Sequence, residues 1–560
     1  MKNLFSNPKI LLITMLLTLI TGCNNAQTET KARDIDVSTE SVIKPNAEFI
    51  RTHMSYLASD ELEGREAGTT GYDKAANYVA TEFEKLGLQA KGDNDSYFQE
   101  VPLRRSYRNK HDLDLKVKTR SGEPLELKES TDFLVNGSLN SAEANITADV
   151  IFVGFGLVAP ELGRDDYKGL DVKGKIVAVL SRTPDGIQSE ERAYYGSLKT
   201  HEASKRGAIG MVSLYTPAAE TIYSFRRRAT EGALDAARMG WIQKDGEIYS
   251  RAPNLKVSAT FSLAGAEKLF ADAPTSWQDI LEAAAKDGGK TPTFQLPVSM
   301  TIKQTSTLSE TRSANVIGVI PGSDPKLKNE VLVLSGHLDH IGISKTVEKD
   351  RINNGALDNA AGIATLIETA RLLMQQTPPK RTILFLANTA EEKGLLGSQY
   401  FVKNQTLLNH KIVANINLDM PVLTYDFTDV IVFGGERSSI NTAIQSAAKQ
   451  MGIAIAKDPF PEQGIFTRSD HFRFVEQGIP AVMLATGMAN GGEKAWAQHF
   501  AKNYHRPSDD MNNNINFDAA AKFAELKTRI TLQIANADKK PLWNKNDFFA
   551  KNFDGPMATQ

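Results

Sequence analysis

The chain has 560 residues and a formal net charge of −2 at pH 7. This length is too great for a single hydrophobic core and indicates two or more domains. The nearly balanced charge argues against a nucleic-acid-binding protein.

The first residues of the chain predict export. Two lysines, Lys2 and Lys9, precede an apolar run at residues 10–20, and about 11 residues are too few to span the hydrocarbon core of a bilayer. The run ends in the letters ITGC, which resemble a bacterial lipobox and imply lipidation of Cys23 after cleavage. Residues 1–22 are therefore expected to be a lipoprotein signal peptide.

The lipidated protein is expected in the bacterial cell envelope, held to the membrane only by its lipid. Residues 23–44 are polar and poor in aromatic residues, which is typical of a tether. Asn24 after the cysteine favours the outer membrane, with the protein facing the periplasm. Since Cys23 is the only cysteine, the mature chain would have no thiol for a disulfide or a zinc–thiolate site. Any metal must then be held by nitrogen and oxygen.

Two amphipathic helices are predicted between residues 46 and 88, where apolar side chains recur at three- and four-residue steps. The glycine-rich loop LASDELEGREAGTTG lies between them. We interpret its charged side chains Asp60, Glu61 and Arg65 as surface charge, with a position near a cleft as the alternative.

The character of the sequence changes between residues 113 and 299. Strand-like runs at 148–153 and 175–180 are separated by segments rich in turn residues. GLDVKGKIVAVL is followed by HEASKRGAIGMVSLY, which we expect to be helical, and together they resemble the protease-associated domain. We predict that residues 113–299 are a smaller, inserted β-rich domain of this kind. It would act as a lid or substrate-selecting module, with a structural spacer as the alternative.

From residue 314 onward strands and helices alternate. This alternation predicts an α/β domain with a mostly parallel central sheet flanked by helices on both faces. The domain would be discontinuous, formed by residues 45–112 and 300–540 and followed by a C-terminal tail at 541–560. The predicted strands are 314–320, 331–334, 382–386, 412–416 and 430–433, and the predicted helices are 358–374, 395–402, 439–451 and 519–534.

Metal-binding side-chain types follow three of these strands. In sheets of this kind ligands bind beyond the carboxyl ends of the strands. One rim is therefore expected to collect an imidazole and several acids. His337 and Asp339 follow the strand 331–334, Glu391 and Glu392 follow 382–386, and Asp419 follows 412–416.

Asp358 precedes a predicted helix, where an ordinary N-cap is the simplest interpretation. So many acids at one rim would repel one another unless cations lie between them. Imidazole and carboxylate suit a pair of zinc ions, and ions ~3.5–4 Å apart need a bridging carboxylate. Asp358 is our choice for this bridge. Glu391 would be free to accept a proton from water, and Asp339 could orient the imidazole of His337.

The segments SGHLDHIG, NGALDNAAG, NTAEEKGLLGS, NLDM and YHRPSDD resemble the motif series of the di-zinc exopeptidases of peptidase family M28. This family includes bacterial leucyl aminopeptidase and glutamate carboxypeptidase. The resemblance implies two zinc ions per chain and a set of roles. His337 and Asp419 would hold one zinc, Glu392 and His505 the other, Asp358 would bridge them, Glu391 would be the general base and Asp339 would support the ligands.

A further segment, SDHFRF, also looks like a family segment. His471 within it is a candidate for contact with the reacting carbonyl, with a structural histidine as the alternative. His340 is not expected to be a ligand.

The function predicted from the resemblance is that of a zinc-dependent aminopeptidase acting on peptides through a zinc-activated water, with Glu391 as general base. The alternatives on the same fold are a carboxypeptidase and a glutaminyl cyclase-like enzyme. Arg468 and Arg506 leave the carboxypeptidase open, because arginine can bind a terminal carboxylate. A non-catalytic, receptor-like binding protein is the alternative of another class.

Overall fold

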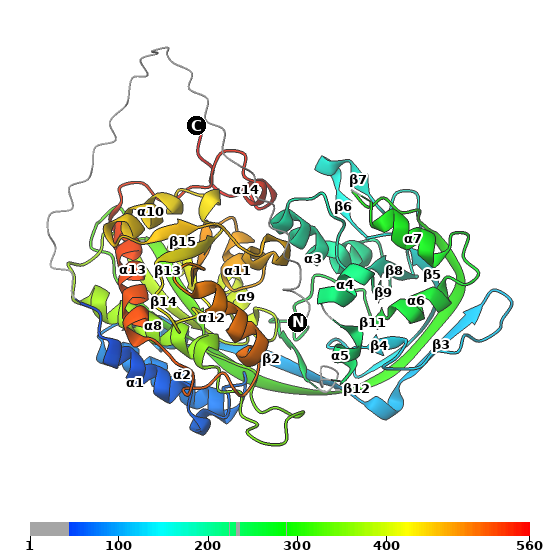
Figure 1. Ribbon diagram of the computed structural model, residues 1–560, viewed down its shortest axis with the longest axis horizontal. Helices are drawn as coiled ribbons and strands as arrows, with labels where there is room; N and C mark the ends of the chain where they lie inside the picture. Colours follow the sequence, from blue (N-terminus) through cyan, green and yellow to red (C-terminus); the bar gives the residue numbers. More distant parts are fainter. Residues whose placement is uncertain (1–43, 223, 231–235, 287, 560) are drawn as a thin grey trace, which may run out of the picture. The chain divides into compact units, whose positions relative to one another are not determined.

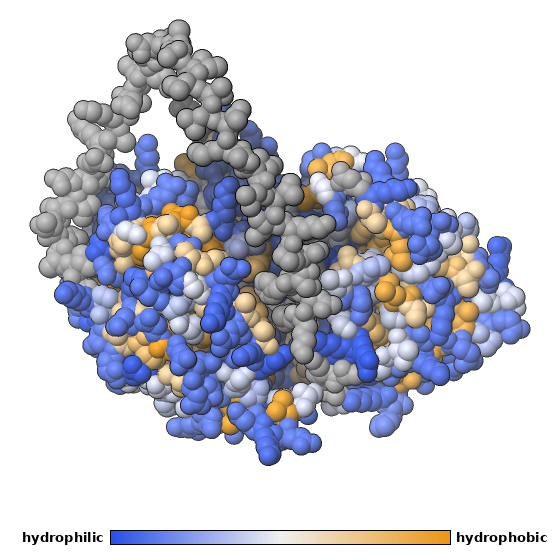
Figure 2. Space-filling model, viewed as in Figure 1, coloured by the Kyte–Doolittle hydropathy of each residue, from blue (hydrophilic) through white to orange (hydrophobic). Residues whose placement is uncertain are grey.

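The computed structural model describes residues 44–222, 224–230, 236–286 and 288–559. The predicted signal peptide, Cys23 and nearly all of the predicted tether lie outside these ranges, so lipidation and the location in the cell envelope stay predictions. Among the described residues, no helix combines the length and the hydrophobicity needed to cross a bilayer. The face of the molecule seen in Figure 2 is mainly hydrophilic, with hydrophobic residues in small separate patches.

One sheet of 16 strands, as far as the described residues show, contains the predicted parallel core. At its centre β14, β13, β15 and β18 run parallel to one another. The antiparallel strands β12 and β16 flank this core, and β17 pairs with β16. The expected α/β fold with a mostly parallel sheet is therefore confirmed (Figure 1). The bounds are β12 Phe294–Ile320, β13 Glu330–His337, β14 Thr382–Asn388, β15 Lys411–Leu418, β16 Asp429–Phe433, β17 Ala454–Ala456 and β18 Ala481–Thr486.

The register of the parallel strands brings their carboxyl ends to one rim. His337 at the end of β13 lies opposite Asn388 at the end of β14, and Gly336 lies opposite Leu418 at the end of β15. The loops that leave these three strands therefore begin side by side.

Helices cover both faces of the central sheet. Alternate side chains of β13 point to opposite faces. Leu332 and Leu334 pack in a core with α1, α2, α8, α10 and α13, whereas Val331 and Val333 pack in a second core with α9 and α11. Figure 1 shows α8 and α13 along the strands of the sheet. The bounds are α1 Ala47–Leu57, α2 Thr70–Lys85, α8 Ala361–Met374, α9 Leu396–Lys403, α10 Ile440–Gln450, α11 His471–Val475, α12 Gly492–Gln498, α13 Phe517–Asn536 and α14 Phe548–Asn552.

The region predicted to be inserted is built around β5, β8, β9 and β11, which pair in that order. The 27-residue strand β12 pairs with β5 in its first half and with β14 in its second. The predicted boundary at residue 299 lies within this strand, and the assignment as a protease-associated domain stays a prediction. The bounds are β1 Gln89–Ala90, β2 Phe98–Arg108, β3 Asp114–Thr119, β4 Phe133–Val135, β5 Glu143–Phe152, β6 Val158–Ala159, β7 Arg164–Asp165, β8 Ile176–Leu180, β9 Gly210–Leu214, β10 Arg238–Trp241, β11 Val257–Phe261, α3 Ser189–Lys205, α4 Pro217–Ile222, α5 Phe225–Thr230, α6 Leu263–Leu269 and α7 Trp277–Ala284.

Two features of the fold differ from the expectation. The segment HEASKRGAIGMVSLY is helical only as far as Lys205, and its last part forms β9. Strand β18 was not predicted. The residues of β9 and β18 are short, largely apolar runs, and the period of such runs does not distinguish a buried strand from a buried helix.

Candidate metal centre

The acids and histidines predicted to bind metal meet at the rim of the sheet. His337 is the last residue of β13, and Asp419 directly follows β15. Glu391 and Glu392 lie in the loop after β14, and Asp358 lies between β13 and α8. His505 follows the short helical segment His499–Asn503. We call Asp358, Glu391, Glu392 and Asp419 the carboxylate cluster.

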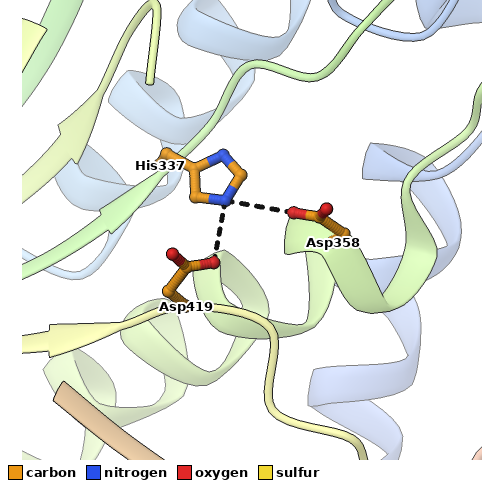
Figure 3. Close-up of side chains that lie close together, drawn as sticks. All are labelled: His337, Asp358 and Asp419. Atoms are coloured by element: carbon orange, nitrogen blue, oxygen red, sulfur yellow. Dashed lines mark hydrogen bonds and ion pairs between the residues drawn. The ribbon is translucent and has the colours of Figure 1, made fainter. Parts of the chain in front are cut away.

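One group of donors forms around His337. Its Nε2 atom lies 3.2 Å from Oδ1 of Asp358 and 3.1 Å from Oδ1 of Asp419. Figure 3 shows the imidazole directed at both carboxylates. Together these three residues bring one nitrogen and two oxygens close enough to hold one metal ion.

A second group forms on the other side of Asp358. Nε2 of His505 lies 3.4 Å from Oδ2 of Asp358 and 3.1 Å from Oε2 of Glu392. The two carboxylate oxygens of Asp358 thus face different histidines. His340 also reaches this group, with Nδ1 2.8 Å from Oε1 of Glu392, and forms a possible metal-binding set with Asp358 and Glu392.

The carboxylate of Asp358 does not accept a hydrogen bond from an amide of α8. Oδ1 of Asn359, not Asp358, accepts the amide of Gly362 in the first turn of the helix. The buried carboxylate of Asp509 accepts the amides of Leu357 and Asp358, each at 3.0 Å. The N-cap interpretation of Asp358 is therefore wrong, because the N-cap of α8 is Ala360 and the Gly362 amide is bound by Asn359.

Asp339 supports the site differently from the expectation. Its carboxylate accepts the amides of Glu391 at 3.0 Å and Glu392 at 3.3 Å. The group facing Nδ1 of His337 is the main-chain carbonyl of Asp339, at 3.0 Å. Strand β13 ends at His337, so residues 337 and 339 do not share the side of a continued strand. The side chain of Asp339 therefore binds the loop of Glu391 and Glu392 instead of His337.

Arg65 is buried, which corrects its interpretation as surface charge; only 1% of it is exposed. Its guanidinium donates to the carbonyls of Leu57, Leu338, Asn354 and Gly355. These carbonyls belong to α1, to the loop that follows His337 and to the loop that carries Asp358. The glycine-rich loop turns Arg65 inward, and the main-chain carbonyls replace the water that a buried guanidinium loses.

Burial and mutual repulsion shift the pKa values of the cluster. Burial raises the pKa of Glu391 well above its usual value, His337 opposes this, and the carboxylates of Asp419 and Glu392 add to it. Burial lowers the pKa of His337, but Asp419 and Glu391 outweigh it and hold that pKa well above its usual value. The acids and the imidazole of His337 therefore shift each other's pKa values.

His471 does not reach the site. It is fully buried beside Phe466, with ring centroids 5.2 Å apart, and it is not among the residues that line the cavity. Burial lowers its pKa to about 3. The structural-histidine alternative therefore fits its position. Its neighbour Asp470 instead binds Asn388 and Ser398 under the rim.

Two residues near the site were not singled out from the sequence: Asp509 and Tyr504. Both lie in the same YHRPSDD motif as His505, which was the available signal. His340, which was not expected to be a ligand, belongs to a possible metal-binding set with Asp358 and Glu392. Tyr504 stacks on His505 with ring centroids 3.9 Å apart.

Several residues at the rim hold left-handed backbone conformations. Ala390, Met420 and His505 have φ values of 52°, 48° and 56°. Ala390 directly precedes Glu391, and Met420 directly follows Asp419. Such conformations cost non-glycine residues about 1–3 kcal/mol each and cluster at functional sites.

The carboxylate cluster lines a cavity. We call its polar lining residues, His337, His505 and the four cluster carboxylates, the floor, and the remaining lining residues the walls. The walls are mostly apolar. They include Ile431, Phe433, Phe460, Ile465, Met483, Met488, Trp496 and Phe500.

The donors fit zinc. Histidine nitrogens and carboxylate oxygens are ordinary zinc ligands, and the two donor groups share Asp358. A cation in each group would also relieve the repulsion that raises the pKa of Glu391. The floor of the cavity therefore has the chemistry of a zinc centre.

Comparison with known proteins identifies related sequences. Residues 315–531 match the sequence model described as peptidase family M28. A probable leucine aminopeptidase 2 of Aspergillus oryzae is 30% identical over 224 residues, which cover 37% of this chain and 41% of that protein. Aminopeptidase YwaD of Bacillus subtilis is 26% identical over 274 residues, covering 48% and 54%. A glutamate carboxypeptidase 2 homolog of Caenorhabditis elegans is 27% identical over 441 residues, covering 69% and 53%.

The chain spans about half the length of these curated relatives. Among solved structures, an aminopeptidase from Aneurinibacillus sp. strain AM-1 matches with a TM-score of 0.50 and 18% identity. The match covers 89% of this chain and 96% of that one. At this identity the match supports the fold.

Proposed function

We propose that the chain, whose residues 315–531 match the sequence model of peptidase family M28, is a zinc-dependent aminopeptidase that removes N-terminal residues from peptides. Two of the relatives named above carry the name aminopeptidase. By this proposal the chain has the same aminopeptidase activity and acts on peptides.

The observation that carries the proposal is the position of Asp358. Its two carboxylate oxygens face His337 at 3.2 Å and His505 at 3.4 Å. A carboxylate shared by two donor groups is what a two-metal site requires. We therefore propose two zinc ions per chain, one held by His337 and Asp419, the other by Glu392 and His505, with Asp358 shared.

Zinc bound there would polarise the carbonyl of the substrate and lower the pKa of a water molecule. Glu391 is the residue proposed to accept the proton of the attacking water and to pass it to the leaving amine. It lines the cavity and lies next to a proposed ligand without being needed as one.

Asp339 keeps Glu391 in position. Its carboxylate accepts the amides of both Glu391 and Glu392, so one side chain sets the base and a metal ligand together. The cavity walls exclude water from the apolar side of the substrate. A carboxylate of the cluster can accept hydrogen bonds from the free ammonium group of a peptide, which favours an aminopeptidase.

The test is a panel of blocked peptides assayed with the purified protein that begins at residue 24. We expect Leu-Gly-NH₂ to be cleaved and acetyl-Leu-Gly-NH₂ to be left intact. Removal of metal with a chelator is expected to abolish cleavage, and zinc to restore it.

Other outcomes identify the alternatives. Release of a C-terminal residue from amino-blocked peptides would indicate a carboxypeptidase. Conversion of an N-terminal glutamine to pyroglutamate without cleavage would indicate a glutaminyl cyclase-like enzyme. Zinc binding without turnover of any peptide would favour a binding protein.

A further inference from the structure

The wall of the cavity holds one basic side chain. Arg468 is the only lysine or arginine among the described residues that line it. It lies on the same wall segment as Ile465 and Ser469, whereas the carboxylate cluster forms the floor.

The main chain around Arg468 is firmly anchored. The amide of Arg468 donates to the carbonyl of Ile465 at 2.9 Å. The next residue, Ser469, accepts a hydrogen bond from Asn417 at 2.8 Å, and Asp470 accepts one from Asn388 at 2.8 Å. The hydrogen bonds of Ser469 and Asp470 reach β15 and β14, so the rim of the sheet sets the position of Arg468.

The side chain of Arg468, by contrast, is exposed. Its guanidinium makes no hydrogen bond or ion pair with any described residue. Other arginines nearby are paired: Arg473 binds Glu476 at 2.9 Å, and Arg437 binds Asp547 at 2.9 Å. Arg468 therefore presents an unused planar donor to the cavity.

Arg468 lines the same cavity as Tyr504 and the four cluster carboxylates. Tyr504 in turn stacks on His505. Arg468 is thus close to the proposed zinc ligands without being paired to any of the four cluster carboxylates.

An unpaired arginine on the wall of such a cavity selects for a carboxylate, because the guanidinium fork matches that group with two parallel hydrogen bonds. The carboxylates of the cluster can accept hydrogen bonds from the ammonium end of a peptide. A peptide with a free amine at the floor would present its second residue to the wall.

On the basis of the proposed aminopeptidase function, we propose that Arg468 binds a carboxylate on the residue that follows the scissile bond. The enzyme would then prefer dipeptides, whose second residue ends in a carboxylate. An aspartate side chain at that residue offers the same chemistry, and the experiment separates the two sources.

The experiment measures kcat/KM for Leu-Gly, Leu-Gly-NH₂ and Leu-Asp-NH₂ with the zinc-loaded protein. If Arg468 forms a charge-assisted hydrogen-bond pair with the carboxylate, kcat/KM for Leu-Gly should exceed kcat/KM for Leu-Gly-NH₂ by about 10- to 100-fold. In the Arg468→Gln variant the ratio of these two kcat/KM values is expected to fall close to one, mainly through a higher KM for Leu-Gly. Arg468→Lys should recover part of the ratio, since it keeps the charge but loses the fork.

The matched control is Arg473→Gln, which removes an arginine from the adjacent helix and outside the cavity. It should keep the wild-type ratio. Thermal unfolding of each variant checks the fold. Fast cleavage of Leu-Gly alone assigns Arg468 to the terminal carboxylate, and fast cleavage of Leu-Asp-NH₂ as well extends it to an acidic side chain.

Equal rates for Leu-Gly and Leu-Gly-NH₂ in the wild type, or an unchanged ratio in Arg468→Gln, would overturn the assignment while leaving the aminopeptidase intact. Failure to cleave any of the three peptides would instead reject the proposed function, and the assignment of Arg468 with it.

Discussion

The guanidinium of Arg65 donates its Nε–H to the main-chain carbonyl of Leu338 at 2.9 Å, one residue past His337. The same side chain donates to Asn354 and Gly355, so that a single buried cation connects the loops of His337 and Asp358. Replacement by lysine keeps the charge but cannot satisfy carbonyls in several directions. We predict that Arg65→Lys weakens zinc binding about 10- to 100-fold, as for other residues that orient metal ligands.

Zinc retained during dialysis against graded chelator concentrations measures this effect. Arg105→Lys is the matched control, because Arg105 donates to the carbonyls of Ala67 and Gly68 in the same loop but does not contact the loops of the metal site. Wild-type zinc retention in Arg65→Lys would show that the loops keep their positions without the guanidinium.

The position of Asp358 between two histidines predicts that its loss affects both metals. We expect Asp358→Asn to hold less than one zinc ion per chain, whereas Asp419→Asn, which alters only the group of His337, should keep one. Metal content of the purified variants by atomic emission tests this difference. Equal zinc content in the two variants would argue against a shared ligand.

Glu391→Gln separates proton transfer from metal binding. The substitution keeps the size of the side chain and both proposed zinc ions. Because a positioned general base contributes about 10²–10⁴-fold, kcat should fall by that factor with little change in KM. Glu392→Gln, one residue on, is expected to lose zinc as well. A Glu391→Gln enzyme with the wild-type kcat would remove the base assignment.

Lys527 on α13 carries a cost in stability. Its Nζ atom is buried and has no hydrogen-bond partner among the described residues, and burial lowers its pKa well below the usual value. In the unfolded chain this lysine stays protonated up to about pH 10.4. The unfolded state therefore binds more protons than the folded state at neutral pH, and this contribution destabilises the fold until the pH rises toward that value.

We predict that Lys527→Met raises the free energy of unfolding at pH 7 by about 1–3 kcal/mol. The gain should shrink as the pH rises from 7 to 10, because the wild-type lysine then loses its proton in the unfolded state too. Denaturant unfolding at both pH values measures this. Lys449→Met on α10, at an exposed position, serves as the control and should change little. A less stable Lys527→Met protein would mean that the ammonium group has a stabilising partner.

Much of the central sheet could be predicted because its strands are continuous apolar runs. The run 331–334 lies within β13, and 382–386 lies within β14. Such strands are buried on both faces, so nearly all of their residues are apolar and the run can be recognised from the local sequence. Strand β18 shows the limit of this reasoning, since its segment is equally apolar but is not among the predicted strands.

The fold class and the meeting of acids at one rim were determined by the sequence itself, because parallel strands place their carboxyl ends together whatever the loops contain. The tertiary structure alone decided the roles within the rim. It turned Arg65 inward, placed Asn359 rather than Asp358 against the amide of Gly362, and kept His471 out of the cavity. These outcomes depend on where β13 ends and on which main-chain groups each loop leaves unpaired, and both follow from contacts between residues far apart in the chain.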